Sequence, residues 1–210
     1  MRIDIFDRMD ECTEEAVQRM LPMVSAQRRE QALRYKHTFG QFCCLKSWMM
    51  LKGLADEWMS GLADRKVDGL MDEWEYNEYG KPTFCLSPLA SRLYFSISHC
   101  KTGIAVVLDD QPVGIDIESI RKADEELIER TMNAEEQAQI MAKGREDERA
   151  RTFTRFWTQK EAVVKCMGTG IESFEQLQTI LVIGDWSLET FEKEKYIYSI
   201  AYGKLHCIGA

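Results

Sequence analysis

The sequence predicts an α+β protein built from two similar halves. Long segments with helical periodicity are followed along the chain by short segments in which apolar and polar residues alternate, as they do in strands. A strand–turn–strand pattern at Tyr94–Leu108 is echoed at Tyr196–Ala210, and helical segments precede both. We therefore expect an N-terminal half of residues 1–110 and a C-terminal half of residues 111–210, packed tightly because no flexible linker separates them.

The N-terminal half is expected to begin with helices. Apolar side chains recur at helical spacing over residues 13–35 and 41–63. Pro22 should interrupt the first helix, because proline lacks the N–H that a helix interior requires. Tyr79–Pro82 contains glycine and proline and predicts a turn. Alternation over residues 93–98 then predicts a strand, followed by a return strand.

The C-terminal half should begin with a strand at Val113–Glu118. Residues 124–142 and 147–167 have helical periodicity, and Gly168 is a favourable residue just past the second helix. The last thirty residues predict a return to strands, at Ile180–Ile183, Tyr196–Ala201 and Leu205–Ile208.

Composition and charge limit the classes of function. The 210 residues are 45% apolar and 30% charged, as in ordinary globular proteins. A net charge of −8 argues against general nucleic-acid binding, which requires a basic face. Basic residues nevertheless outnumber acidic ones by seven to four over residues 143–165. That segment either receives an acidic partner or is a solvated helix face with paired charges.

The cysteines and the first residues of the chain predict a cytoplasmic protein. Seven cysteines make an odd count, and no two have the spacing of a zinc or redox motif. We expect free thiols in a reducing compartment. The start, Met1-Arg2-Ile3-Asp4, lacks the apolar core of a secretory signal, and no apolar run approaches the ~20 residues of a membrane helix.

Two carboxylates share one face of the strand predicted at Val113–Glu118. Asp116 and Glu118 are two residues apart, so both side chains point the same way, while Ile115 and Ile117 point to the opposite face. Paired carboxylates repel each other unless a cation lies between them. The alternative is an ordinary solvent-facing strand with alternating acidic and apolar residues.

A third carboxylate and a lysine lie one turn apart on the helix predicted at residues 147–167. Glu161 and Lys165 share a helix face because they are four residues apart. Three carboxylates and an ammonium group suit a hard cation that holds a phosphate-bearing substrate. The plainer reading is a surface ion pair. His99, at a strand end, is either structural or a donor to a phosphate oxygen.

Three sequence blocks follow one another in a fixed order. A Gly-Lys-Pro block and a later strand ending in Ser-His are present at residues 80–82 and Phe95–His99. The pattern [VI]G[IV]D[IV]E is matched at Val113–Glu118 without a departure, and W-x-x-KE-[AS]-x-x-K-x-x-G-x-G is matched from Trp157 to Gly170. Together these blocks resemble the Sfp-type 4′-phosphopantetheinyl transferases.

The resemblance implies a fold and a reaction. The fold would be two similar α+β halves in a pseudo-twofold arrangement with the site between them. The reaction would transfer the 4′-phosphopantetheine group of coenzyme A to a serine of an acidic apo acyl or peptidyl carrier protein, in the presence of Mg²⁺. The enzyme would work as a monomer and release 3′,5′-ADP, with no role for nucleic acid or a membrane.

The resemblance also implies roles for individual residues. Asp116, Glu118 and Glu161 would hold the magnesium ion. Glu161, Lys165 and Asp116 form the catalytic set, in which Glu161 deprotonates the serine and Lys165 steadies the leaving group. The coenzyme A contacts would come from Arg28, Lys81, Pro82, Ser98, His99 and Lys165. The sequence has Gln31 and Cys43 where basic residues that hold the 3′-phosphate are common in the family.

Two other functions fit the same motifs. One is a non-catalytic module that binds coenzyme A or a carrier protein, although decayed enzymes tend to lose a metal ligand, and Asp116, Glu118 and Glu161 are all present. The other is a metal-dependent diphosphate hydrolase, which would turn over a nucleotide without an acceptor protein. Neither of these alternatives requires a different fold.

Overall fold

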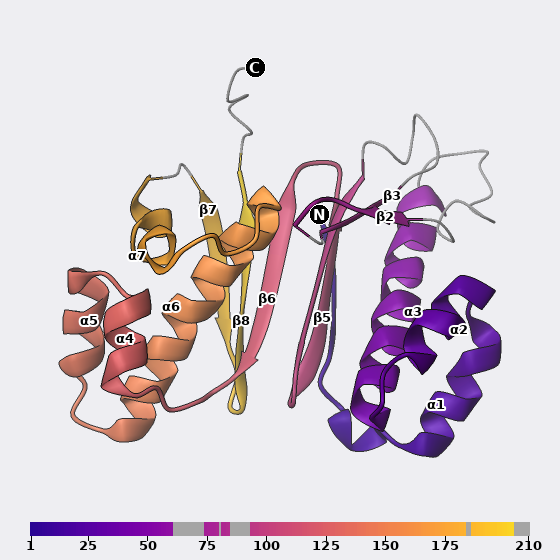
Figure 1. The fold of residues 1–210 in the computed structure, drawn as a ribbon, viewed down its shortest axis with the longest axis horizontal. Helices are drawn as coiled ribbons and strands as arrows, with labels where there is room; N and C mark the ends of the chain where they lie inside the picture. Colours follow the sequence, from indigo (N-terminus) through magenta and orange to yellow (C-terminus); the bar gives the residue numbers. More distant parts are fainter. Residues whose placement is uncertain (61–73, 80, 85–92, 184–185, 204–210) are drawn as a thin grey trace.

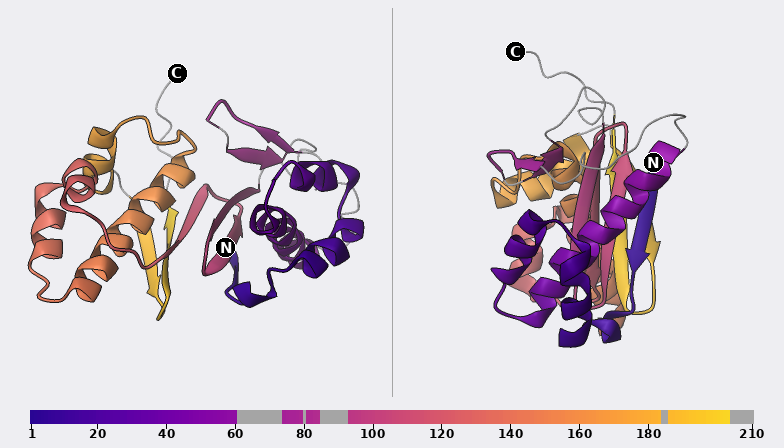
Figure 2. Two further views of the ribbon diagram at one scale, coloured as in Figure 1. Left: turned by 60° about the horizontal axis from the view of Figure 1, so that its bottom comes forward. Right: turned by 90° about the vertical axis from the view of Figure 1, so that its right-hand side faces the viewer.

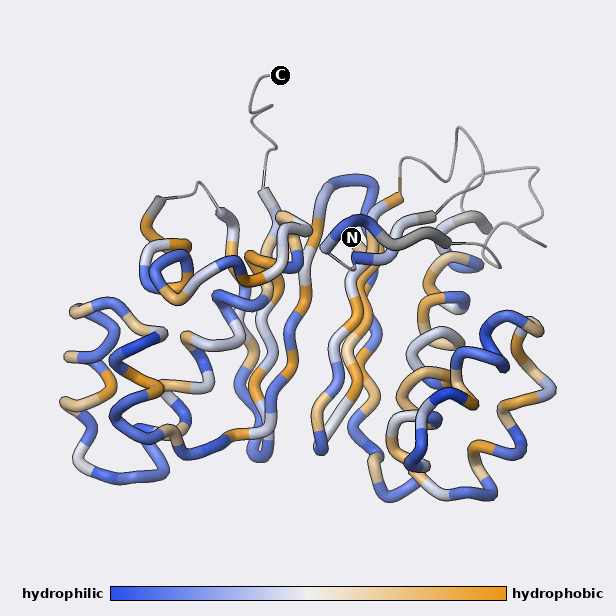
Figure 3. Tube along the Cα trace, viewed as in Figure 1, coloured by the Kyte–Doolittle hydropathy of each residue, from blue (hydrophilic) through white to orange (hydrophobic). Residues whose placement is uncertain are grey.

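The structure is a computed structural model that describes residues 1–60, 74–79, 81–84, 93–183 and 186–203. Strands occupy the centre, and helices from the two halves of the chain lie on opposite sides of them (Figures 1 and 2). Apolar residues concentrate along the central strands, while the outer helices carry more polar residues (Figure 3). The predicted α+β class is confirmed. None of the described helices is long and apolar enough to cross a membrane.

The N-terminal half has its described helices between the first strand of its main sheet and the other two. Its elements are β1 (Arg2–Phe6), η1 (Met9–Glu11), α1 (Glu14–Met20), η2 (Leu21–Met23), α2 (Ala26–Leu33), α3 (Thr38–Ser60), β2 (Trp74–Tyr76), β3 (Pro82–Phe84), β4 (Tyr94–Cys100) and β5 (Gly103–Asp109). Strands β1, β5 and β4 form an antiparallel sheet in that order, and β2 and β3 form a separate hairpin. Pro22 ends the first helix, as predicted, since η2 separates α1 from α2.

The C-terminal half has the same plan. Its elements are β6 (Val113–Ser119), α4 (Glu125–Thr131), α5 (Ala134–Met141), α6 (Glu146–Met167), α7 (Phe174–Ile183), β7 (Ser187–Glu192) and β8 (Tyr196–Tyr202). Strands β6, β8 and β7 form an antiparallel sheet. The predicted division at residues 110/111 falls in the short connection between β5 and β6, and it stays a prediction.

The two sheets pack against each other, and each outer face is covered by one long helix. Ala105 and Val107 on β5 share an apolar cluster with Ile115 on β6 and Ile200 on β8. The alternate residues of β5, such as Val106, pack instead into the core that contains α3. Because side chains alternate along a strand, the residues of β6 on either side of Ile115 face α6.

Gly114 brings the catalytic candidates together by letting α6 approach β6. A Cβ at Gly114 would lie 2.0 Å from the carbonyl oxygen of Ala162 and 2.4 Å from the backbone nitrogen of Cys166. Only glycine fits at this crossing. The next residues of β6 on the same face, Asp116 and Glu118, are therefore presented to α6 at short range.

Two predicted elements are wrong. The helix predicted over residues 124–142 is two helices, because Asn133 and Glu136 form a capping box that starts α5 anew. The strand predicted at Ile180–Ile183 is the last part of α7. Leu177 and Ile180 are three residues apart and both pack against α6, so the short apolar run is one face of a helix.

The echo between the halves exists, but its second member is displaced. The hairpin β4–β5 corresponds to β7–β8, so Tyr196–Tyr202 is the second strand of its hairpin and not the first. The strand predicted at Leu205–Ile208 lies outside the described residues. Strands β1 and β7 were not expected from the sequence. The five described cysteines are all free thiols, as predicted.

A candidate active site between the two halves

Three polar side chains from three elements meet where β4 lies beside β6. Ser98 on β4 donates a hydrogen bond of 2.8 Å from its Oγ to Oδ1 of Asp116 on β6. Lys165 on α6 donates from Nζ to the same Oδ1 at 2.6 Å and to Ser98 Oγ at 2.9 Å. Asp116 is 3% exposed, so its charge depends on these donors. The structure thus brings Ser98, Asp116 and Lys165 together as the motifs predict.

Glu118 lies two residues further along the same face of β6. Burial raises the pKa of its carboxyl group, and the nearby Asp116 raises it further. Arg121, Lys165 and a hydrogen bond from the Trp157 side chain act in the opposite direction. The charges of Asp116 and Lys165 therefore both act on the carboxyl group of Glu118.

Glu161 completes the acidic group from α6. Burial raises its pKa to about 7, and Asp116 and Glu118 add to the shift. Lys165 and Arg121 lower it. A pKa near neutral pH suits a general base, because part of the population is ionised at that pH and the carboxylate is more basic than an ordinary glutamate.

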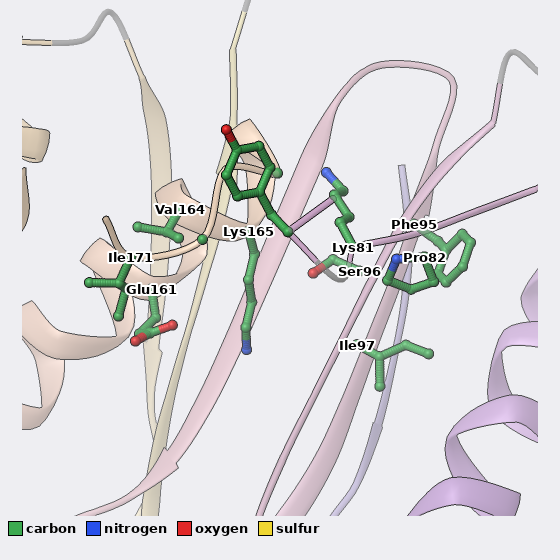
Figure 4. Close-up of a pocket in the computed structure, with 12 residues that line it drawn as sticks. Lys81, Pro82, Phe95, Ser96, Ile97, Glu161, Val164, Lys165 and Ile171 are labelled. Carbon is green, nitrogen blue, oxygen red and sulfur yellow. The ribbon is translucent and has the colours of Figure 1, made fainter. Parts of the chain in front are cut away.

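A cavity of about 380 Å³ opens beside these residues (Figure 4). Both halves of the chain line it, with Tyr79, Lys81, Pro82, Phe95, Ser96 and Ile97 from one side and Glu161, Val164, Lys165, Gly168, Gly170 and Ile171 from the other. Glu161 and Lys165 extend from α6 in the same general direction, and Lys81 lies across from them (Figure 4). The cavity combines apolar walls with cations, which suits a ligand with both an apolar part and phosphates.

Lys81 lies in the β2–β3 turn and Pro82 begins β3, and this turn is held against the end of α6. Lys81 donates from Nζ to the carbonyl oxygen of Cys166 at 3.0 Å. Asn77 donates from Nδ2 to the carbonyl oxygen of Gly168 at 2.8 Å. Burial lowers the pKa of Lys81. Its ammonium group thus serves here as a cap for α6, whose last carbonyl groups lack helical partners.

His99 and Arg28 stand at different distances from this centre. His99 follows Ser98, its ring meets that of Phe39 edge-on at 5.9 Å, and burial and Lys165 lower its pKa. Arg28 is buried in the helical layer of the N-terminal half, where Nη1 donates to Sγ of Cys44 at 3.6 Å. Arg28 does not line the described cavity. The structure therefore places His99 beside the site but does not bring Arg28 into it.

Lys160, inside the same motif as Glu161, points away from the site. Its side chain is completely buried, and Nζ donates to Oε2 of Glu136 at 2.7 Å and to the carbonyl oxygens of Thr131 and Leu177. These acceptors come from α4, α5 and α7. Lys160 therefore fastens three neighbouring helices to α6 and does not face the cavity.

The basic residues around α6 are largely engaged within the protein. Arg145 pairs with Asp147, and Arg149 donates to the carbonyl oxygen of Lys143. Arg151 donates to the carbonyl oxygens of the β7–β8 turn. Of the two readings of this segment, a helix face with internally paired charges describes it better than an open acceptor surface.

The acidic group fits magnesium in its chemistry. Oδ2 of Asp116 is buried and has no hydrogen-bond partner, and burial, reinforced by the nearby carboxylates, raises the pKa values of Glu118 and Glu161. Hard oxygen ligands of this kind are those that Mg²⁺ prefers. As the side chains stand, no three His, Cys, Asp or Glu residues in the described ranges lie close enough together to hold a metal ion.

Two contributors to the site escaped the sequence reasoning. Arg121 stacks on Trp157, with its guanidinium carbon 5.1 Å from the ring centroid, and its charge acts on both Glu118 and Glu161. Asn77 joins the two sides of the cavity. The proximity of Arg121 to the Val113–Glu118 motif was a signal for the first, whereas nothing in the sequence distinguished Asn77.

Two α+β halves with a carboxylate–lysine site between them are the arrangement expected of an enzyme that acts on a phosphate-bearing ligand. Residues 112–203 match the sequence model of the 4′-phosphopantetheinyl transferase superfamily. These residues include β6, α6 and β8, and therefore Asp116, Glu118, Glu161 and Lys165. The resemblance inferred from the three sequence blocks is thus confirmed for the part of the chain that carries these residues.

Relatives extend the similarity into the N-terminal half. The chain is 26% identical to "4′-phosphopantetheinyl transferase Sfp" of Bacillus subtilis (strain 168) over 76% of its length and 66% of that protein. It is 29% identical to "4′-phosphopantetheinyl transferase psf-1" of Bacillus pumilus over 77% of its length and 65% of the relative. A 37% identity to "4′-phosphopantetheinyl transferase AcpT" of Salmonella typhimurium covers 53% of the chain and 58% of that relative. The chain thus spans less than two thirds of these relatives.

Proposed function

We propose that this protein transfers the 4′-phosphopantetheine group of coenzyme A to a serine of an apo carrier protein, with Mg²⁺ as the cofactor. The observation that carries the proposal is the position of Glu161, a carboxyl group with a pKa of about 7, in a cavity it shares with Lys165. The names of the relatives support the same reaction. A base that is partly ionised at neutral pH and a neighbouring cation are what such a transfer requires.

The proposed step is a displacement at phosphorus. The serine hydroxyl of the carrier gives its proton to the carboxylate of Glu161, and the serine oxygen forms a bond to the phosphorus that bears the pantetheine arm. The bond from that phosphorus to the bridging oxygen of the diphosphate breaks, and 3′,5′-ADP leaves with the electron pair. Lys165 neutralises the negative charge on the departing oxygen. Asp116 and Ser98 position the ammonium group of Lys165 by accepting hydrogen bonds from it.

Asp116, Glu118 and Glu161 are the residues that would hold the magnesium ion. When bound, the ion would neutralise charge on the diphosphate oxygens. The buried Oδ2 of Asp116, which has no partner, supports this assignment. The raised pKa values of Glu118 and Glu161 support it as well, because carboxylates whose charge is disfavoured by burial and by one another gain stability from a cation.

Coenzyme A would lie in the cavity between the halves. Lys81, Pro82, Ser98, His99 and Lys165 are our candidates for its contacts, and the first two form the wall opposite α6. Arg28 does not line this cavity, and its described contact is with Cys44. It remains a candidate for the 3′-phosphate alone. An acidic carrier protein, a monomeric state and a cytoplasmic location stay predictions.

Intact-protein mass spectrometry tests the reaction directly. An apo acyl carrier protein is incubated with the protein, coenzyme A and Mg²⁺, and we expect it to gain the mass of one phosphopantetheine. The gain should disappear when EDTA removes the metal. Glu161→Gln should reduce the rate by about 10²–10⁴-fold, the usual contribution of a general base.

Two results would contradict the proposal. Coenzyme A binding without a mass gain on acyl and peptidyl carriers would indicate a binding module. Release of 3′,5′-ADP without carrier modification would indicate a hydrolase. A wild-type rate in Glu161→Gln would leave the reaction standing but remove Glu161 from it.

A further inference from the structure

The β2–β3 turn is fastened to the end of α6 by the side chain of Asn77. Its Oδ1 accepts hydrogen bonds from the backbone nitrogens of Tyr79 at 3.0 Å and Lys81 at 2.8 Å, which fixes the turn. Its Nδ2 donates to the carbonyl oxygen of Gly168 at 2.8 Å. One amide group therefore shapes the turn and joins it to a residue 91 positions away in the sequence.

The end of α6 is built to receive this turn. Gly168 has a φ of +76°, which favours glycine, and a Cβ there would lie 2.8 Å from Cδ of Lys81. The carbonyl oxygens of Cys166 and Gly168 have no partners within the helix, so they are free to accept from Lys81 and Asn77. Asn77 and Lys81 therefore meet two acceptors that the helix end leaves open.

The hairpin needs such an anchor because it is small. Strands β2 and β3 have three residues each and pair only with each other within the described sheets. A two-stranded hairpin of this length is at best marginally stable by itself. The hairpin nevertheless supplies Tyr79 and Lys81 from its turn and Pro82 from β3 to one wall of the cavity.

We propose that Asn77 is a positioning residue, which holds the turn residues Tyr79 and Lys81, and with them the start of β3 at Pro82, against α6 and so forms the coenzyme A pocket. This inference rests on the proposed function for the identity of the ligand. Asn77 does not line the described cavity and acts through the residues that do. Without its amide, the Lys81 bond to Cys166 is the remaining described hydrogen bond between this segment and α6. The wall then separates more readily from Glu161 and Lys165, and the pocket is less well formed before coenzyme A binds.

The first test measures the fastening without any ligand. Amide hydrogen exchange is compared among the wild-type protein, Asn77→Ala, Asn77→Asp and the control Asn133→Ala. Asn133 is also a capping asparagine, but it starts α5 on the far side of α6. We expect faster exchange over residues 164–170 in both Asn77 variants and over residues 77–84 mainly in Asn77→Ala, which also loses the acceptor of the turn. Neither change should occur in the control, whose melting temperature should fall instead.

Asn77→Asp separates the two functions of the amide. The carboxylate keeps an oxygen that accepts both hydrogen bonds of the turn but cannot donate to Gly168. Its negative charge also repels the carbonyl end of α6. Exchange over residues 164–170 should therefore rise in Asn77→Asp as much as in Asn77→Ala. Wild-type exchange there in both variants would overturn the inference, because the amide would then not hold the two segments together.

The second test measures the consequence for the ligand. Isothermal titration with coenzyme A should show a dissociation constant about tenfold higher in Asn77→Ala than in the wild type, as expected for the loss of a few hydrogen bonds. The transfer rate at saturating coenzyme A should change little, so the effect is on KM. An unchanged dissociation constant would overturn the inference. If the wild type itself bound no coenzyme A, the proposed function would fail, and the exchange experiment would still decide whether Asn77 fastens the turn.

Discussion

Two lysines on α6 illustrate how one helix serves both structure and chemistry. Lys160 and Lys165 are five residues apart, which places their side chains about 140° apart around the helix. The Lys160 side chain is completely buried and has three protein acceptors, whereas that of Lys165 is 29% exposed and borders the cavity. A lysine whose donors are all used inside the protein has none left for a ligand. The difference separates a structural ammonium group from one available to a substrate.

The two lysines have different partners and therefore different roles in the protein. Burial lowers the pKa of Lys160, and the hydrogen bond from its ammonium group to Glu136 counteracts this. Glu136 thus stabilises the charged form of Lys160 against the effect of burial. Lys165 shares Asp116 with Ser98, and its environment also contains the charges of Glu118 and Glu161. Lys160 therefore serves to hold α6 in its position, whereas Lys165 presents an ammonium group to the cavity.

The largest expected effect comes from Lys160→Met. This change leaves Glu136 buried without its cation, which typically costs about 3–5 kcal/mol in the free energy of unfolding. Urea denaturation followed by circular dichroism measures the loss. In the double variant with Glu136→Gln, part of the stability should return, because the uncompensated charge is gone. Equal losses in the single and double variants would show that the pair is not coupled.

Lys165→Met should reverse this pattern. We expect the transfer rate to fall by about 10²-fold, or ~3 kcal/mol in the activation barrier, because the leaving group loses its cation. Stability should fall too, because the buried Asp116 loses its cation, but less than in Lys160→Met, since Asp116 keeps the bond from Ser98 and fewer hydrogen bonds are lost. The two variants are compared in the same assays at a temperature where both are folded. A rate loss in Lys160→Met as large as in Lys165→Met, with full folding, would remove the distinction.

The sequence predicted the parts of this site that depend on local geometry. Period-two alternation placed Asp116 and Glu118 on one face of β6, and helical spacing placed Glu161 and Lys165 on one face of α6. The glycine at the end of α6 was also predicted. These features follow from backbone geometry within a few residues, so no knowledge of the packing was required.

The remaining features depend on contacts between distant segments. The pair of Lys160 with Glu136 spans 24 residues and that of Asn77 with Gly168 spans 91, and neither has a local signal. The apolar run at Ile180–Ile183 is too short for periodicity to distinguish a strand from a helix face. Only its packing against α6 decides. The coenzyme A role predicted for Arg28 came from the family resemblance, and its burial beside Cys44 has no local signal in the sequence.

The pH dependence of stability tests whether Glu161 is as strongly buried as its surroundings indicate. Its pKa is raised from 4.5 to about 7 in the folded protein. Between these values the folded state binds a proton that the unfolded state has lost, so the contribution of Glu161 to stability falls as pH rises from 4.5 to 7. In EDTA, Glu161→Gln should therefore gain on the wild type across this window, by at most about 3 kcal/mol. A constant difference from pH 4.5 to 8 would contradict the shift.

The smallest expected effect concerns Trp157, which supports Glu118 from α6. A hydrogen bond from its side chain lowers the pKa of Glu118, and its ring stacks on Phe153 at 6.0 Å between centroids. Trp157→Phe keeps the stacking and removes the donor, so the pKa of Glu118 should rise and the Mg²⁺ concentration for half-maximal rate should increase a few-fold, as for a net loss of ~1 kcal/mol. Trp186→Phe is the matched control, because Trp186 packs in the apolar cluster of α6 and α7. If both variants change the Mg²⁺ requirement equally, the Trp157 bond does not act through Glu118, and the site then depends on general packing of α6.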